Sequence, residues 1–453
     1  MIRPYFQSTR NLILGCLLLL GLGLMAGWFI LSPRVDANLK PLRGTIFDRN
    51  GKELAVSHRA NSLYANPREV QDVEGLAKKL APLLNMSEET LRSQLTAQGS
   101  FVWLKRAMEP SEYNRIAEFL RSEKARGLDF VAESRRVYPN ELLAAHVLGF
   151  VGTDEKGLAG VEMSMDAAIK GKLIHLTLDS GMQSAVEQAL ENVMAQTKVQ
   201  SATMIVMNPQ TGEVLAMASR PSFNPNVFFR YPEQTWRNPA ISSIQLNIAT
   251  VKEQLSDAGT LVGSSEGFQS LAEACGLGQP TGIELPGEEA GSVSAVAVTP
   301  LQLLTAFSAL ANDGKLLKPQ IIKEIRDGTG KLVRTSSPQL ARQAVTPEMA
   351  RKLLVFLEKH LLEGSSNRVA VASYRLAGKA FNSGRLSQAG SSADSRQIID
   401  SFVGLGSLED IQLTGLVLVD TTGGKSLDGE LASPVFAEAM SQILQSRKLS
   451  PSR

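Results

Sequence analysis

The sequence predicts an α+β protein, an antiparallel sheet with helices packed on it, that follows a single membrane-spanning helix. Short strands joined by hairpin turns are the first indication, as at 203–207 and 214–218, which flank a turn at 208–212. Helical segments with apolar residues at three- and four-residue spacing are interleaved with these strands, an order typical of α+β domains. An uncharged apolar run of 20 residues, 12–31, precedes them all.

The run at 12–31 is long enough to cross a bilayer, because about 1.5 Å per residue gives a helix of roughly 30 Å. Arg3 and Arg10 precede it, so the positive-inside rule keeps the tail 1–11 in the cytoplasm. A cleaved signal peptide is the alternative. The length of the run and the lack of a small-x-small cleavage site before Pro33 argue against it.

The composition is that of an ordinary globular protein, with 43% hydrophobic and 20% charged residues among 453. The net charge of +2 comes without a clustered basic excess, so we predict no nucleic-acid partner. The histidines are scattered and no Gly-rich phosphate loop occurs, so we predict neither a metal nor a cofactor. Cys275 is expected to pack as a small hydrophobe.

The first region after the apolar run extends over 32–172. Asn50 and Gly51 predict a tight turn between strands at 45–47 and 53–56. Apolar spacing between 72 and 127 predicts helices, and small linking elements follow.

The second region begins with a strand at 173–178 and a helix that Asp179 or Ser180 caps. Thr299 and the proline after it open another helix, because Thr is a good N-cap and Pro fits the first helical position. The remaining expected elements are a hairpin (321–325 and 331–334), a helix opened by Thr346, a flexible Ser/Gly-rich loop at 382–395, strands at 401–405 and 413–419, and a helix at 434–444.

Several short motifs occur in a specific order: 43–51 (RGTIFDRNG), 136–139 (RVYP), 144–152 (AAHVLGFVG), 157–162 (GLAGVE), 207–225, 281–288 (TGIELPGE) and 299–303 (TPLQL). In this order, behind one membrane span, they resemble class B penicillin-binding proteins, the membrane-anchored D,D-transpeptidases that cross-link peptidoglycan. The resemblance covers most of the chain, and residues 62–67 and 101–106 are similar to the septal type that acts in cell division.

The resemblance implies a single-pass protein of the inner membrane, with the bulk of the chain periplasmic or extracellular. Expected partners are membrane proteins of the divisome or of cell-wall synthesis, and peptidoglycan itself. The chain between 227 and 280 is shorter than in active relatives, so we expect a truncated helical subdomain there. The implied domains are the tail 1–11, the transmembrane helix 12–31, a pedestal or dimerisation-type domain 32–172, a transpeptidase-like domain 173–446 and a tail 447–453.

The nucleophile of such enzymes is missing from the sequence. In the S-x-x-K motif the lysine amine takes the serine proton so that the oxygen can attack a carbonyl. No serine in the chain is followed three residues later by lysine. The motif should follow residues 237–243, but the chain continues with Ile244-Gln245-Leu246-Asn247.

The family's other two catalytic motifs are altered. By register, S-x-N falls at 264–266, which reads Ser-Ser-Glu, so a charge replaces the amide that bonds the substrate. K-[ST]-G appears at 379–381 as Lys-Ala-Phe, which loses the hydroxyl and puts a bulky ring where glycine lets the edge strand approach the substrate. The vestigial motif positions are therefore Ser264, Ser265, Glu266, Lys379, Ala380 and Phe381.

Residues 263–267 also match the nucleophile-elbow pattern G-x-S-x-G, although the family register accounts for these serines. Two function classes remain. The first is a non-catalytic homologue that serves as a structural or partner-binding component; the second is an active D,D-transpeptidase with an unidentified nucleophile. An internal deletion or a decaying paralogue is a third account. The missing serine–lysine pair favours the first.

Overall fold

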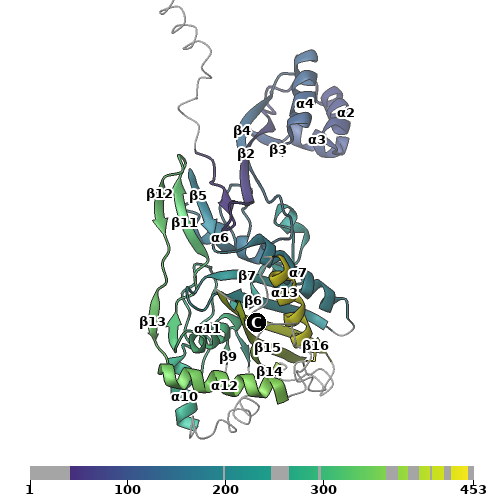
Figure 1. Cartoon of the computed structure of the whole chain (residues 1–453). Helices are drawn as coiled ribbons and strands as arrows, with labels where there is room; N and C mark the ends of the chain where they lie inside the picture. The colour runs from purple at the N-terminus through teal and green to yellow at the C-terminus, as the bar shows by residue number, and fades with distance from the viewer. Residues whose placement is uncertain are drawn as a thin grey trace, which may run out of the picture. The chain divides into compact units, whose positions relative to one another are not determined.

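The computed structural model describes residues 41–196, 199–245, 265–293, 297–363, 376–385, 397–408, 411–422 and 430–446 (Figure 1). The predicted membrane span at 12–31 lies outside these residues. Within the described part of the chain, we find no helix that is both long enough and apolar enough to cross a bilayer.

A small subdomain near the N-terminus combines three antiparallel strands with three helices. Its core includes Leu63, Leu80 and Leu91, all fully buried. The side chains of Asp72 and Ser87 cap two of the helices by accepting backbone N–H groups. The elements are β2 (Glu53–Ala65), α2 (Val73–Leu84), α3 (Glu88–Leu95), β3 (Val102–Met108), α4 (Pro110–Ser122) and β4 (Leu128–Val137).

The helices predicted between 72 and 127 are confirmed, but β3 and β4 are not among the predicted elements. Both strands have few buried side chains and therefore lack a clear two-residue period. The predicted hairpin is present, and its second strand, β2, is much longer than residues 53–56.

A seven-stranded sheet joins this subdomain to strands from later in the chain. Its order is β12-β11-β5-β1-β2-β3, with β4 also paired to β2. β1 and β5 run parallel, whereas β5 and β11 are antiparallel. The predicted domain boundary at 172/173 therefore falls inside a strand of this sheet. The added strands are β1 (Ile46–Phe47), β5 (Lys172–Leu176), β11 (Ile322–Asp327) and β12 (Leu332–Thr335).

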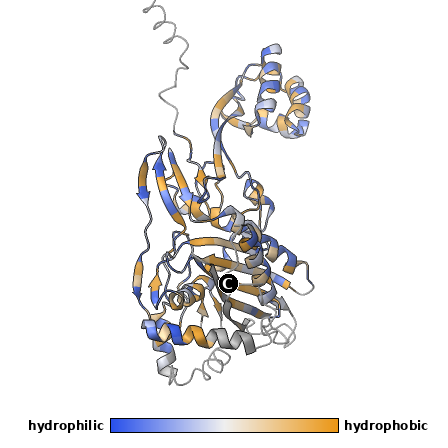
Figure 2. Cartoon of the chain, in the orientation of Figure 1, coloured by the Kyte–Doolittle hydropathy of each residue, from blue (hydrophilic) through white to orange (hydrophobic). Residues whose placement is uncertain are grey.

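A second, five-stranded sheet is antiparallel throughout, which confirms the predicted α+β fold. Two helices that pack on each other, α7 (Ser180–Met194) and α13 (Ala432–Ser446), cover one of its faces (Figure 1). Hydrophobic residues dominate its strands β6 and β7 (Figure 2). In order, the strands are β14 (Leu376–Arg385), β15 (Gln397–Leu408), β16 (Ile411–Thr422), β6 (Val199–Met207) and β7 (Val214–Arg220).

The opposite face of this sheet packs against α11 (Pro300–Leu310), whose N-cap is Thr299 as predicted. A capping box with Gln302 reinforces that start. The other elements are α5 (Ala145–Leu148), α6 (Gly160–Ser164), η1 (Pro225–Arg230), η2 (Glu233–Trp236), η3 (Pro239–Ile241), β8 (Ile244–Gln245), α10 (Ser265–Ala274), β9 (Ala297–Val298), β10 (Lys315–Leu317), β13 (Leu340–Gln343) and α12 (Pro347–Glu363).

The prediction of a loop at 382–395 is wrong at the start of that range. Residues 382–385 are the end of β14, because they pair in register with residues 397–400 of β15. The serine and glycine in this stretch favour a loop prediction, since neither has a high strand propensity.

Two glycines of the five-stranded sheet leave room for the ring of Phe436 in α13. A Cβ atom on Gly404 would lie 2.6 Å from Cζ of Phe436, and one on Gly415 would lie 2.8 Å from Cε2. The ring is fully buried, so it has little space to move aside.

We expect Gly404→Ala to lower the free energy of unfolding by about 1–3 kcal/mol, because the added methyl group overpacks this contact. Urea-induced unfolding measures the loss. Adding Gly404→Ala to Phe436→Leu, whose side chain is smaller, should cost less than adding it to the wild type. Strictly additive losses would show that ring and glycine do not conflict.

Candidate functional site

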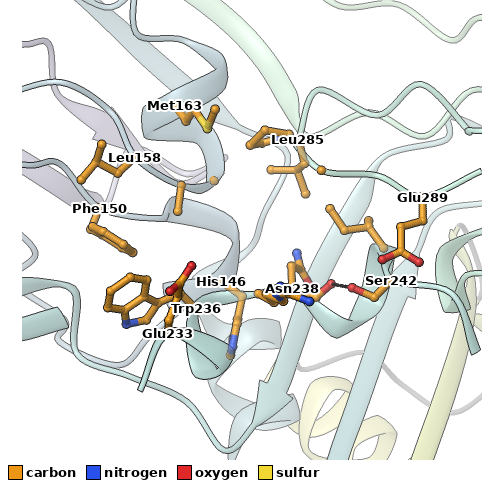
Figure 3. A pocket seen from close by; sticks show the side chains of 16 residues that line it. His146, Phe150, Leu158, Met163, Glu233, Trp236, Asn238, Ser242, Leu285 and Glu289 are labelled. Atoms are coloured by element: carbon orange, nitrogen blue, oxygen red, sulfur yellow. Dashed lines mark hydrogen bonds between the residues drawn. The ribbon is translucent and has the colours of Figure 1, made fainter. Parts of the chain in front are cut away.

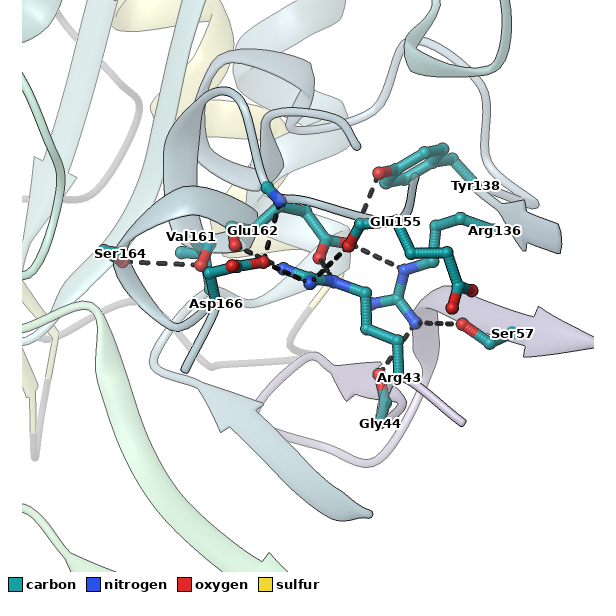
Figure 4. Close-up of polar contacts among 11 residues, drawn as sticks. Arg43, Gly44, Ser57, Arg136, Tyr138, Glu155, Val161, Glu162, Ser164 and Asp166 are labelled. Carbon is teal, nitrogen blue, oxygen red and sulfur yellow. Dashed lines mark hydrogen bonds and ion pairs between the residues drawn. The ribbon is translucent and has the colours of Figure 1, made fainter. Parts of the chain in front are cut away.

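Three motifs that are far apart in the sequence meet at a buried cluster of charges (Figure 4). Glu162 of α6 accepts a hydrogen bond from Arg43 Nε at 2.5 Å and one from Arg136 Nε at 2.6 Å. The side chains of these three residues are at most 1% exposed. Asp166 adds a carboxylate 2.5 Å from Arg43 Nη1. Two guanidinium groups therefore face two carboxylates, and their formal charges balance.

The cluster joins backbone segments as well as side chains. Arg136 Nη1 donates to the carbonyl of Gly44 at 2.7 Å and to Ser57 Oγ at 3.0 Å. Burial disfavours the charge on Arg43, but the carboxylates of Glu162 and Asp166 outweigh it and raise the pKa of Arg43. Burial, assisted by Glu162, raises the pKa of Tyr138 well above its usual value, so this phenol stays protonated. The cluster therefore holds the segments of Gly44, Arg136 and Glu162 together, and we call such a contact a structural joint.

Asp48 forms a second joint, between the β1–β2 turn and the start of α7. Its Oδ1 accepts hydrogen bonds from the N–H groups of Asn50 and Lys52, both at 2.8 Å. Its Oδ2 accepts from the N–H of Ser180 at 3.1 Å and from the hydroxyl of Ser180 at 2.7 Å. Asp48 is 2% exposed, so its charge depends on these four donors for solvation.

Residues 379–381 lie in β14, the edge strand of the five-stranded sheet. Ala380 pairs with Phe402 and belongs to the apolar layer beneath α7 and α13. Lys379 and Phe381 are the register positions opposite Val403 and Ser401. The side chain of Val403 belongs to the core on the other face of the sheet. Residues 379–381, which the sequence assigns to the third motif, therefore lie in an edge strand.

Residues 264–266 are only partly described. Ser264 lies outside the described residues, and Ser265 and Glu266 are the first two residues of α10. The strand that a nucleophile elbow at 263–267 would need also lies outside them. The structure therefore leaves both interpretations of this segment as predictions.

The segment that would lead to the nucleophile motif is held by the loop at 281–289. Glu289 accepts hydrogen bonds from the hydroxyl of Ser243 and from its N–H at 2.8 Å, and these bonds lower the pKa of Glu289. The N–H of Glu289 donates to the carbonyl of Ile241 at 3.0 Å. Gln302 of α11 supports the loop by donating to the carbonyls of Gln279 and Ala290. Apart from the family motif at 281–288, no sequence pattern indicates the Ser243–Glu289 contact.

A cavity of about 410 Å³ opens beside this segment (Figure 3). Its lining comes from residues 146–163, from 233–242 and from the loop at 285–289. Phe150 and Trp236 form an edge-to-face ring pair, 5.1 Å between centroids. Among the described lining residues, Ser242 carries the only hydroxyl, and it donates to the backbone carbonyl of Asn238 at 3.1 Å instead of to a base. The described part of the lining therefore holds no serine hydroxyl that donates to a base.

Comparison with known protein families shows which family this chain belongs to. The family model for the penicillin binding protein transpeptidase domain matches residues 202–245 and 247–441, more than half of the chain. The model for the penicillin-binding protein dimerisation domain matches residues 38–200. The chain belongs to the class B penicillin-binding proteins.

Curated members of the family are similar over most of their length. Peptidoglycan D,D-transpeptidase FtsI of Escherichia coli is 26% identical, over 98% of this chain and 93% of that protein. Stage V sporulation protein D of Bacillus subtilis is 27% identical, over 91% of this chain and 79% of that protein. The alignment to FtsI spans 564 positions, whereas this penicillin-binding protein has 453 residues, so FtsI contains stretches with no counterpart here.

Solved structures show the same fold at lower sequence identity. A peptidoglycan synthetase from Bifidobacterium adolescentis has a TM-score of 0.69 at 22% identity, covering 92% of this chain and 97% of that one. Penicillin Binding Protein 2X from Streptococcus thermophilus has a TM-score of 0.63 at 20% identity, covering 91% and 82%.

His146 of this penicillin-binding protein is buried and packs edge-to-face on Phe223, with ring centroids 5.4 Å apart. Its Nε2 lies 3.0 Å from the carbonyl of Thr235, so Nε2 must carry the proton. Burial lowers the pKa of His146 from 6.5 to about 4, so the ring is neutral at pH 7. These contacts give His146 a structural role.

The lowered pKa predicts a loss of stability in mild acid. Between pH 6.5 and 4, His146 binds a proton in the unfolded chain but stays neutral in the folded protein. The free energy of unfolding therefore decreases as the pH falls. We expect a contribution of about 2 kcal/mol between pH 7 and pH 5. His146→Gln can still donate to Thr235 but cannot titrate. Urea unfolding at the two pH values should therefore show a smaller difference for His146→Gln, and an equal difference would contradict the assignment.

Proposed function

We propose that this class B penicillin-binding protein is a non-catalytic component of peptidoglycan synthesis or cell division that serves as a structural or partner-binding module. One observation carries the proposal: no serine of the chain is followed three residues later by lysine. Without that amine, a serine hydroxyl keeps its proton at neutral pH and is a poor nucleophile toward an amide carbonyl.

The third motif supports the proposal. Its Lys-Ala-Phe sequence lies in edge strand β14, and we assign it to the family's K-[ST]-G position from the sequence. Ala380 has no hydroxyl to offer a substrate carboxylate. Phe381 replaces the glycine that gives a substrate access to the strand backbone. Loss at one motif would be a point change, whereas losses at several motifs indicate that the whole site is no longer under selection for acyl transfer.

The sequence before the described residues supports a membrane location. The apolar run 12–31 follows Arg3 and Arg10, so we place the protein in the inner membrane with its N-terminus inside and its bulk in the periplasm or outside the cell. Proteins of the divisome or of cell-wall synthesis, and peptidoglycan, are the partners that this location and family suggest.

An active D,D-transpeptidase is the second candidate. The relatives described above include a protein named peptidoglycan D,D-transpeptidase, and this chain keeps the family's sheet, α11 and Lys379. Such an enzyme would need a nucleophile activated by some group other than an S-x-x-K lysine.

Covalent labelling by a fluorescent penicillin separates the two. We expect no labelled band for this protein in a denaturing gel, while an intact class B penicillin-binding protein in the same membranes is labelled. Labelling that unlabelled penicillin competes away would establish an active-site nucleophile and reject the non-catalytic assignment.

A further inference from the structure

Residues 331–343 form an extended strip along one edge of the molecule, and β12 and β13 are its two short strands (Figure 1). Every side chain in the strip except that of Ser336 is exposed. β12 ends the order of the seven-stranded sheet, and β13 pairs with β10 in a two-stranded sheet, so each has one unpaired side among the described strands. The strip therefore offers backbone N–H and C=O groups to another chain.

Three large apolar side chains lie on the strip. Leu332, Val333 and Leu340 are 47%, 55% and 59% exposed. Arg334 pairs with Ile325 and Leu332 with Arg326, so the register shifts at Val333 and the alternation of faces is interrupted there. Leu332 and Arg334 pair with successive residues of β11 and so lie on opposite faces, and Lys331, next to Leu332, shares the face of Arg334. Exposed apolar side chains on an unpaired edge are features of a pairing surface.

The strip is also cationic. Lys331, Arg334 and Arg342 lie in it, and residues 331–343 contain no acidic side chain. The acidic group paired with Arg334 is Glu284, at 3.7 Å, and Arg342 donates to the carbonyl of Glu273 and to Gln279. Glu284 and Asp327, whose carboxylate accepts the N–H of Lys331 at 3.0 Å, stand against three cations, so the strip keeps excess positive charge for an acidic partner.

Protection of an edge against aggregation explains part of this pattern. Short strands, Lys331, Arg334 and Pro338 are all devices that discourage edge pairing. They do not explain why Leu332, Val333 and Leu340 are exposed, because a protected edge needs no apolar side chains. A surface that excludes unspecific strands but accepts an acidic one accounts for both sets of residues.

We propose that the 331–343 strip is a docking edge for an extended segment of a partner protein in which acidic and apolar residues alternate. The segment would add a strand beside β12, with its apolar side chains against Leu332 and Val333 and its carboxylates near Lys331 and Arg334. The docking edge would be present whether or not the protein is catalytic, so it goes beyond the proposed function.

A fluorescent peptide of alternating Glu and Val residues tests the proposal by anisotropy with the full-length protein in detergent. We expect saturable binding that Val333→Glu weakens at least tenfold. Val355→Glu is the matched control, because Val355 is 64% exposed on α12 and should leave binding unchanged. Both changes affect exposed side chains, so unaltered melting temperatures should confirm folding.

Two further probes decide the chemistry. The same peptide with N-methylated alternate amides keeps its charges but cannot complete a strand ladder, so it should bind at least tenfold more weakly. Equal binding of both peptides, or binding to phosphatidylglycerol vesicles with the same Val333 dependence, would make the strip a simple anion-binding surface and overturn the proposal. Absence of peptide binding would also overturn it. None of these outcomes alters the penicillin-labelling result, so the two proposals fail separately.

Discussion

Glu162→Gln is expected to lower the free energy of unfolding by about 3–5 kcal/mol, because it leaves two buried guanidinium groups without their shared carboxylate. Arg43 and Arg136 both donate to Glu162, and neither can reach solvent. Asp166 would remain as a partner for Arg43 alone. Thermal and urea unfolding of the full-length protein measure the effect.

Glu123→Gln is the matched control for this prediction. Glu123 pairs with Lys79 at 2.6 Å, but the two side chains are 37% and 52% exposed. Exposed pairs of this kind contribute about 0–1 kcal/mol. If Glu162→Gln costs no more than Glu123→Gln, the buried cluster is not the joint that we describe.

Asp48→Asn should cost about 2–4 kcal/mol, because an amide NH₂ would face donors that now meet a carboxylate oxygen. The four hydrogen bonds of Asp48 connect the β1–β2 turn with the first turn of α7. Its loss should therefore loosen both segments together. Hydrogen exchange is the sharper measurement, since the amides of Asn50, Lys52 and Ser180 should all exchange faster.

Asp327→Asn provides the comparison. Asp327 accepts hydrogen bonds from the N–H groups of Thr329 and Lys331 and from the Thr329 hydroxyl, in an exposed turn between β11 and β12. Water can replace those donors, so the change in stability should be much smaller. Faster exchange confined to residues 50–52, with Ser180 unaffected, would contradict a link to α7.

Local patterns predicted the elements that have local signals. Thr299 and the proline after it mark a helix start whatever the tertiary context, and Asn50-Gly51 marks a turn. The long strand β4 has no such signal, because its side chains are half-exposed on both faces. The parallel pairing of β1 with β5 joins residues 46 and 174, and no periodicity specifies a partner at that distance.

The candidate site, too, could be predicted only in part from the sequence. The motifs containing Arg43, Arg136 and Glu162 are separate in the sequence, and no pattern indicates that their three charges share one buried cluster. The absence of a serine–lysine pair needs no structure at all, since it is a property of the sequence. The position of residues 379–381 in the fold, by contrast, comes only from the structure. Register places Lys379 and Phe381 on an edge strand opposite Val403 and Ser401.

The most direct test of the central claim is intact-protein mass spectrometry after long incubation with excess benzylpenicillin. The chain's missing serine–lysine pair predicts an unchanged mass, with an active class B penicillin-binding protein in the same sample gaining one penicilloyl group. A stoichiometric penicilloyl adduct on this protein would contradict the account, and the modified residue would identify the nucleophile.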